Sequence, residues 1–353
     1  LGGDEFLVLC EHGPRPLAEA TAQIILERLR TPIHLGLMEV YTSCSIGIAM
    51  YPQHGDSLET LIRCADTAMY VAKEEGKHTY RVFSLEMNQK VAKYMWLDTN
   101  LRKALEEEQF VLYYQPVVDI ATGDVHGVEA LIRWQSPDRG LVAPIEFIRF
   151  AEESGLIAPL GRWVMRTAAA QAAAWKAKGL GIRIAVNVSA RQLQDMNIVH
   201  QFASILDGAG LKPGLLDIEL TESCFIEDEE AAIGLMRQFR QLGAEIHLDD
   251  FGTGYSSLSQ LSRLPLDAIK LDRTFITAID RNPRSQALVH SVVSLAKALN
   301  FAVVAEGVET HAEAEFLKQL DVDHAQGYYY ARPMPAQAFE AWLAETRKLR
   351  LIA

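Results

Sequence analysis

Two adjacent carboxylates, Asp249 and Asp250, end a short apolar run and precede a loop, residues 251–258, that is rich in Gly, Ser and Thr. Neighbouring carboxylates repel each other, and holding them together is costly unless a positive charge lies between them. Mg²⁺ and Mn²⁺ prefer oxygen ligands of this kind. The pair indicates either a divalent-cation site or, because these residue types are common in loops, a capped turn at the surface.

Other short apolar runs that end in polar or charged residues lie on both sides of this loop. Buried parallel strands have this near-continuous apolar character, and helical-period stretches at Gly161–Lys178, Glu229–Leu242 and Ser285–Leu299 separate several of them. The alternation of roughly eight βα units predicts an α/β fold, a (β/α)₈ barrel of about 250 residues with its chemistry at the carboxyl ends of the strands. The runs are Val125–Arg133 with Glu129, Arg183–Ser189 with Asn187, Leu215–Glu222 with Glu219 and Glu222, Glu245–Asp250, Ala268–Asp272 with Lys270, Phe301–Glu309 with Glu306 and Glu309, and His324–Pro333 with Gln326.

Strand geometry predicts that these polar residues converge. Residues two apart share one face of a strand, so Glu129 and Arg133 point the same way, as do Lys270 and Asp272. One mouth of the barrel would then gather about five carboxylates, an amide and a lysine. The alternative is that each acid is a solvated loop residue that happens to follow a strand.

The segment from about Tyr94 to Leu349 resembles an EAL domain, the phosphodiesterase that opens cyclic di-GMP. Its motifs occur in order along the chain: Tyr114-Gln115-Pro116, Glu129-Ala130-Leu131, Asn187-Val188-Ser189, Glu219-Leu220-Thr221-Glu222, the Asp249-Asp250 loop, Ile269-Lys270-Leu271-Asp272, Ala305-Glu306-Gly307-Val308-Glu309 and Gln326-Gly327-Tyr328. The resemblance implies a TIM-like barrel whose first strand is reversed. The turn Thr122-Gly123-Asp124 agrees, because a short turn joins antiparallel strands, here Val111–Asp119 and Gly127–Arg133.

The start of the chain is similar to the second half of a GGDEF domain, the α+β diguanylate cyclase fold. Gly2-Gly3-Asp4-Glu5-Phe6 is its signature, although Gly2-Gly3 alone indicates only a hairpin turn; supporting matches are Ser45-Ile46-Gly47-Ile48-Ala49, Tyr51-Pro52 and Ala65-Asp66-Thr67-Ala68-Met69-Tyr70. We expect a partial GGDEF domain at residues 1–86, a linker at 87–94 and an EAL domain at 95–349. A half domain leaves apolar surface uncovered, and no cyclase activity is expected from this chain.

The EAL resemblance implies roles for particular residues. Hydrolysis of cyclic di-GMP to linear pGpG would use two Mg²⁺ or Mn²⁺ ions, which stabilise the charge that develops on the phosphate. Lys270 would act on the attacking water and Glu222 would orient the loop after Asp250; these two, with Glu129 and Glu306, form the expected catalytic set. The expected metal ligands are Glu129, Asn187, Glu219, Asp249, Asp250 and Glu306. The expected substrate contacts are Gln115, Arg133, Asp272, Glu309 and Gln326.

Composition limits the remaining alternatives. The net charge of −12 argues against a nucleic-acid polymer as partner. The chain contains no apolar run of about 18 residues, and its four cysteines, without a CxxC spacing, are interpreted as buried thiols in a reducing cytoplasm. Trp96–Glu107 carries one apolar stripe and is either a signalling helix or a packing helix. We further expect a homodimer through the EAL domain, and a parent chain with an upstream sensor domain and a membrane anchor in missing segments.

Three functional classes remain open at this point. The first is an active hydrolase, and the second is a degenerate EAL receptor that binds cyclic di-GMP without cleaving it. Such receptors lack one or more ligands, whereas every matched ligand position is filled here. The third is a bifunctional parent enzyme that also makes cyclic di-GMP. An unrelated barrel metalloenzyme would leave the paired GGDEF and EAL motifs unexplained.

Overall fold

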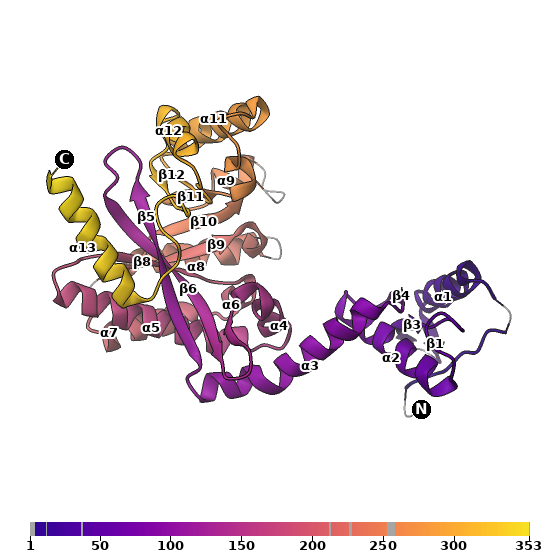
Figure 1. Cartoon of the computed structure of the whole chain (residues 1–353). Coiled ribbons are helices and arrows are strands. Elements are labelled where there is room, and N and C mark those ends of the chain that lie inside the picture. The colour runs from indigo at the N-terminus through magenta and orange to yellow at the C-terminus, as the bar shows by residue number, and fades with distance from the viewer. Residues whose placement is uncertain are drawn as a thin grey trace. The chain divides into compact units, whose positions relative to one another are not determined.

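The computed structural model describes residues 4–11, 13–36, 38–211, 213–225, 228–252 and 258–352, without the side chains of 35, 258, 259 and 349–352. The expected turn at Gly2-Gly3 and the part of the catalytic loop at residues 253–257 lie outside these ranges. The chain forms two compact units, Leu1–Asn100 and Leu101–Ala353, and each is described by itself (Figure 1).

The first unit mixes helices with short strands, as expected of a partial α+β domain. It contains α1 (Arg15–Leu29), the antiparallel pair β1 (Ile33–Leu35) and β2 (Met38–Val40), the parallel pair β3 (Ile46–Ile48) and β4 (Tyr80–Val82), and α2 (Leu58–Glu74). Its core is small and is built around Cys64, Ala68 and Phe83. Phe6 and Leu9 are 89% and 78% exposed, so the expected uncovered apolar surface is present.

Helix α3 (Leu85–Glu106) contains the segment that we expected to be a linker, residues 87–94. The helix predicted at Trp96–Glu107 therefore begins earlier, and the division between the two compact units, at Asn100, falls inside it. Leu97 and Leu101 are almost fully buried, in agreement with the apolar stripe.

The second unit is a barrel of eight strands, closed by pairing between its first two strands and carrying a short extra strand, β7 (Gly140–Val142), at one edge. This confirms the predicted architecture. The barrel strands are β5 (Phe110–Asp119), β6 (Val125–Ser136), β8 (Arg183–Asn187), β9 (Leu216–Thr221), β10 (Ile246–Phe251), β11 (Ala268–Leu271), β12 (Ala302–Ala305) and β13 (His324–Ala325).

The opening strand is reversed, as predicted. β5 runs antiparallel to both β6 and β13, while the other neighbouring barrel strands are parallel. In the turn between β5 and β6, the Asp119 carboxylate accepts hydrogen bonds from the Thr122 backbone N–H and hydroxyl, and Gly123 adopts a φ of +71°. A left-handed backbone of this kind is readily adopted by glycine.

Helices surround the strands on the outside of the ring (Figure 1). The predicted helices are present with small boundary shifts: α5 (Ile157–Ala177), α8 (Glu229–Gln241) and α11 (Pro283–Ala298). The Ala-rich face of α5 is buried at Ala168, Ala169 and Ala172, where small side chains allow close packing. The remaining elements are η1 (Pro144–Glu146), α4 (Ile148–Glu153), α6 (Ala190–Leu193), α7 (Ile198–Gly208), η2 (Glu222–Phe225), α9 (Leu258–Leu261), α10 (Arg273–Ile276), α12 (His311–Gln319) and α13 (Ala336–Ile352).

The last two observed strands are shorter than the apolar runs that predicted them. β12 ends at Ala305, and β13 comprises only His324 and Ala325, because the chain turns at Gly327. A Cβ atom at Gly327 would lie 2.1 Å from the carbonyl oxygen of Val308, so this turn is packed directly against the neighbouring backbone and requires glycine.

The interpretation of all four cysteines as buried thiols is wrong at two positions. All four are free, and Cys64 and Cys224 are buried, but Cys10 is exposed and Cys44 is half-buried. Cys10 follows the uncovered apolar residues of the first unit, where there is little core to bury it. Among the described residues, no helix has the length and apolar character needed to cross a membrane.

Candidate active site

Each of the eight barrel strands contributes one polar side chain to the same mouth. Five of these residues lie within strands, and Asn187 is the last residue of β8. Glu306 and Gln326 directly follow β12 and β13. The carboxyl ends of parallel strands meet at one end of a barrel, and the reversed β5 contributes Gln115, which lies near its middle and pairs in register with Glu129. The ring consists of Gln115, Glu129, Asn187, Glu219, Asp249, Lys270, Glu306 and Gln326.

Lys270 is the ring member on which four carboxylates converge, and it is 1% exposed. Its Nζ is 2.7 Å from Glu306 Oε1, 2.9 Å from Glu219 Oε2, 3.3 Å from Asp249 Oδ1 and 3.4 Å from Glu129 Oε2. Burial acts to lower the pKa of Lys270, but the surrounding carboxylates outweigh it and hold the pKa well above its ordinary value. Lys270 is therefore an ammonium ion in this arrangement.

Glu129 is fixed by two other side chains besides Lys270. Its two oxygens accept hydrogen bonds from Asn187 Nδ2 at 2.8 Å and from Gln326 Nε2 at 2.8 Å, and Gln326 Nε2 also contacts Gln115 Oε1 at 2.9 Å. Burial acts to raise the pKa of Glu129, yet Lys270 and the amides of Gln326 and Asn187 hold it below its ordinary value. Gln115 and Gln326, expected as substrate contacts, thus lie in the barrel interior and order a carboxylate.

The adjacent pair Asp249 and Asp250 reaches one site through an unusual backbone. Consecutive residues on a strand normally point to opposite faces. Asp250 has a φ of +54°, and the register between β10 and β11 shifts between Leu248 and Phe251. Carboxylate oxygens of Asp249, Asp250 and Glu306 consequently lie within 4.8 Å of one another.

The charge of this cluster is not balanced by Lys270 alone. Burial, followed by the nearby carboxylates, raises the pKa of Glu219 to about 7 and that of Glu306 to about 8. Burial and then Asp249 also raise the pKa of Asp250. A nearby cation stabilises the ionised form of such acids. Because the set is rich in oxygen ligands, it suits Mg²⁺ or Mn²⁺. The residues present therefore fit a divalent-metal centre, in which Asn187 would turn its amide oxygen toward the ion.

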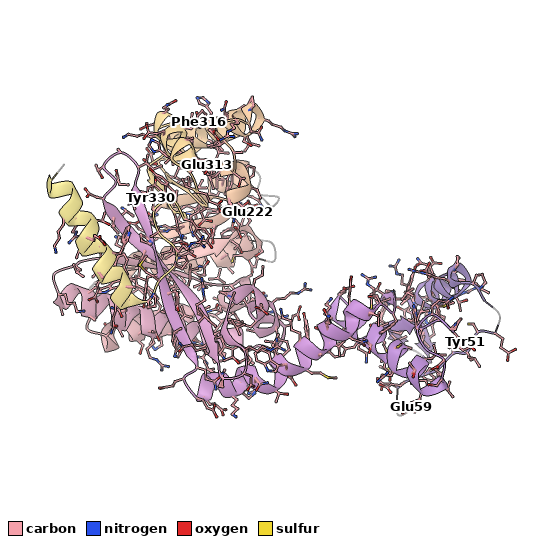
Figure 2. The ribbon with its side chains drawn as sticks, viewed as in Figure 1. Tyr51, Glu59, Glu222, Glu313, Phe316 and Tyr330 are labelled. Atoms are coloured by element: carbon pink, nitrogen blue, oxygen red, sulfur yellow. The ribbon has the colours of Figure 1, made fainter. Side chains whose placement is uncertain are left out.

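Glu222 lies outside the ring and contacts the loop that follows β10. It opens the 3₁₀ turn η2, and its Oε1 accepts a hydrogen bond from the backbone N–H of Gly252 at 2.9 Å (Figure 2). Gly252 is itself confined, because a Cβ there would lie 2.8 Å from the ring of Phe275. The contact agrees with the expected loop-orienting role.

We predict that Glu222→Ala lowers turnover while its affinity for Mn²⁺ stays within a few-fold of the unsubstituted chain, because the side chain holds the loop and not the ion. Glu222→Gln keeps an acceptor for the Gly252 N–H and should lose less activity. Parallel turnover assays and Mn²⁺ titrations of the two variants would test this. An alanine variant that binds Mn²⁺ as poorly as a ring-carboxylate variant would make Glu222 a direct ligand.

The other three expected substrate contacts do not belong to the ring. Arg133 is half-buried, donates to the Ile132 carbonyl and lies over the ring of Tyr113. Asp272 caps α10 by accepting from the Thr274 N–H at 2.9 Å. Glu309 is exposed and pairs with Arg273 at 2.9 Å. Their role toward a substrate stays a prediction.

A second charged cluster, which the sequence reasoning missed, lies inside the barrel on the amino-terminal side of the ring. It comprises Arg183, Asp217, Glu245 and His247 and lines a cavity of about 370 Å³ whose walls also include Glu219 and Lys270. The spacing in the sequence could have revealed two members of this cluster. Asp217 lies two residues before Glu219, and His247 lies two residues before Asp249, so each shares an inward strand face with a ring residue.

An eight-stranded barrel with a reversed first strand and carboxylates gathered around a lysine defines the class of this protein as a TIM-like barrel with an acidic cluster of the type that fits a metal ion. Residues 98–333 match the model of the EAL domain, and residues 1–79 match that of the diguanylate cyclase GGDEF domain. The chain belongs to the EAL domain family.

Two relatives that are named as cyclic di-GMP phosphodiesterases match nearly the whole chain. Cyclic di-GMP phosphodiesterase PdeR of Escherichia coli K12 is 54% identical over 97% of this chain and 51% of its own length. Bifunctional diguanylate cyclase/cyclic di-GMP phosphodiesterase MucR of Pseudomonas aeruginosa is 41% identical over 98% of this chain and 50% of its own length. The chain thus spans about half the length of these curated relatives.

A solved structure of the PaMucR phosphodiesterase in complex with c-di-GMP matches with a TM-score of 0.67 and 42% identity, covering 69% of this chain and 99% of that one. The EAL domain of Mycobacterium smegmatis DcpA matches with a TM-score of 0.57 and 34% identity, covering 67% of this chain and 96% of that one.

Proposed function

We propose that this chain hydrolyses cyclic di-GMP to linear pGpG in a reaction that requires Mg²⁺ or Mn²⁺. The observation that carries the proposal is the ring itself, in which four of the five expected acids, Glu129, Glu219, Asp249 and Glu306, converge on one buried lysine, and the amide of Asn187 contacts two of them. The relatives named for cyclic di-GMP hydrolysis, and the related structure with the dinucleotide, support the choice of substrate.

Two divalent ions would supply Lewis-acid stabilisation of the charge that develops on the phosphate. Glu129, Asn187 and Glu219 would hold one ion, Asp250 and Glu306 the other, and Asp249 would serve both. Two such ions together with Lys270 would balance the five carboxylates, which removes the electrostatic obstacle to an anionic substrate.

The chain's own residues would then position the reactants. Lys270, kept as an ammonium by its neighbours, would donate a hydrogen bond to the attacking water or to the phosphate and oppose negative charge there. Gln115 and Gln326 would hold Glu129 in place, and Glu222 would hold the loop after Asp250. Arg133, Asp272 and Glu309 are the remaining candidates for contacts with the dinucleotide.

The decisive experiment is chromatography of cyclic di-GMP after incubation with the purified chain. We expect pGpG with Mg²⁺ or Mn²⁺, no turnover in excess EDTA, and recovery when the metal is restored. Undiminished turnover in EDTA would refute the metal requirement. Binding of cyclic di-GMP without pGpG at saturating metal would instead favour the receptor alternative.

The parent chain is proposed to carry an upstream sensor domain and, like the relative MucR, which is named as a bifunctional enzyme, to combine both activities. The GGDEF match at residues 1–79 supports the presence of cyclase-like sequence. We also propose that two copies of the chain form a homodimer through the barrel. Analytical ultracentrifugation of this chain would test this.

A further inference from the structure

Glu219 divides its two carboxylate oxygens between different partners. Oε2 faces the ring, 2.9 Å from Lys270 Nζ and 3.3 Å from Asn187 Nδ2. Oε1 faces the opposite way, 3.7 Å from His247 Nδ1. The side chain of Glu219 is 1% exposed, so water contributes little to fixing its orientation, and its direction depends on these neighbours.

His247 is placed beside Glu219 by the register of the barrel. The two residues are partners in the parallel pairing of β9 and β10, and both point inward. The other ring nitrogen of His247, Nε2, lies 3.5 Å from Glu245 Oε2. The imidazole therefore bridges a ring carboxylate and a second carboxylate that belongs to the cluster below.

Glu245 is anchored in turn. Its Oε1 lies 3.0 Å from Arg183 Nη2, and Arg183 binds Asp217 through two hydrogen bonds of 2.8 and 2.5 Å. The series Glu219, His247, Glu245, Arg183, Asp217 alternates acidic and basic groups across the barrel interior. A chain of this kind restrains its members, because the carboxylates at its two ends, Asp217 and Glu219, are 2% and 1% exposed and depend on these partners.

A metal ion in this second cluster is the competing interpretation, since ligand atoms of Asp217, Glu245 and His247 lie within 4.8 Å of one another. The guanidinium of Arg183 argues against it. Arg183 occupies both oxygens of Asp217 and one of Glu245, so a cation would have to lie against a fixed positive charge. The cluster is better described as an ion-pair network.

We propose that His247 is a positioning residue of the active site, which holds Oε1 of Glu219 so that Oε2 is presented to the metal. This inference rests on the proposed function, because it assumes that Glu219 is a metal ligand. Groups that orient a metal ligand from behind change metal affinity by roughly 10–100-fold when they are removed. His247 would act through Glu219 and would touch neither metal nor substrate.

The surroundings of His247 allow a direct test. The layer below the ring is lined by the small residues Gly127, Ala185, Ala268 and Ala302, which leave the cavity of about 370 Å³. His247 lines this cavity. Its replacement by alanine would enlarge an existing space, into which free imidazole can fit.

The experiment compares two variants of similar size, His247→Leu and His247→Gln, in the whole chain. Free Mn²⁺ is measured by electron paramagnetic resonance during titration, and turnover of cyclic di-GMP is measured at saturating Mn²⁺. We expect His247→Leu to bind Mn²⁺ roughly 10–100-fold more weakly, with turnover at saturation within a few-fold. His247→Gln retains a side-chain donor and should bind Mn²⁺ more tightly than the leucine variant.

The matched control is His126→Ala. His126 lines the same cavity and stacks on His324 with ring centroids 4.0 Å apart, and it belongs to neither the ring nor the ion-pair network. Its Mn²⁺ affinity should stay unchanged. If His247→Leu does not fold, as judged by circular dichroism, His247→Ala with and without added imidazole replaces it, and imidazole should restore Mn²⁺ binding where thiophene, an apolar ring of similar size, does not.

The outcomes separate this inference from the proposed function. If the unsubstituted chain binds no Mn²⁺ and needs none for turnover, the proposed metal centre fails. If it binds Mn²⁺ and the leucine and glutamine variants bind it equally well, or if thiophene restores binding as well as imidazole does, His247 is only a packing residue and the inference is overturned.

Discussion

Replacement of Glu129 by Gln should lower turnover of cyclic di-GMP by roughly 10²–10³-fold or more, the range seen when one group that stabilises developing charge is lost. Glutamine keeps the size of the side chain but removes the negative charge on which three donors converge: Lys270, Asn187 and Gln326. Glutamine offers one amide oxygen in place of two carboxylate oxygens, so the buried donors Lys270 and Gln326 no longer share a charged acceptor.

Steady-state rates over a range of Mn²⁺ concentrations would measure this effect, together with direct Mn²⁺ titration. Glu315→Gln is a suitable control, since Glu315 is an exposed residue of α12 with the same chemistry. Near-normal turnover of Glu129→Gln at limiting Mn²⁺ would remove Glu129 from the metal centre and from the catalytic set.

Replacement of Lys270 by Met should lower turnover by roughly 10²–10⁴-fold, as expected for lost proton-transfer or electrostatic assistance. Methionine retains most of the aliphatic stem of a side chain that is 1% exposed, which limits the cavity left by the substitution. Without metal, this variant has four carboxylates that no longer share a cation. In the absence of metal it should therefore be less stable to unfolding than the unsubstituted chain.

Calorimetry should show that Lys270→Met still binds Mn²⁺ and cyclic di-GMP while turnover falls. Lys297→Met, at a partly exposed lysine of α11, provides the matched control. Turnover equal to that of the unsubstituted chain across pH would exclude a catalytic role for Lys270. Loss of substrate binding in this variant would move the main cationic contact elsewhere, and Arg133 would be the next candidate.

The sequence by itself determined the architecture and most members of the ring. Each strand appears as a short apolar run with a polar residue near its end, and parallel strands bring such residues to one mouth. The reversed first strand was implied by the family resemblance, and the local turn at Thr122-Gly123-Asp124 agreed with it. Strand lengths were less certain, and β13 is far shorter than its apolar run suggested.

Only the tertiary structure decided which ring residues contact one another. Gln115 and Gln326 are 211 positions apart in the chain and meet because barrel closure places β5 beside β13. The balance of burial against four carboxylates, which keeps Lys270 protonated, likewise depends on side chains from four different strands. Glu309 resembled a site residue in sequence, yet it is exposed and pairs with Arg273.

The contact between His247 and Glu219 shows the physical reason for this division. Alternation along a strand determines which face a side chain occupies, and it is a local property of the sequence. The neighbour that the side chain meets on the next strand depends on the register between the strands. That register is set by closure and packing of the whole barrel. The sequence therefore determined the inward-facing residues, and the closed barrel determined their partners, their pKa shifts and the oxygen of Glu219 that faces the site.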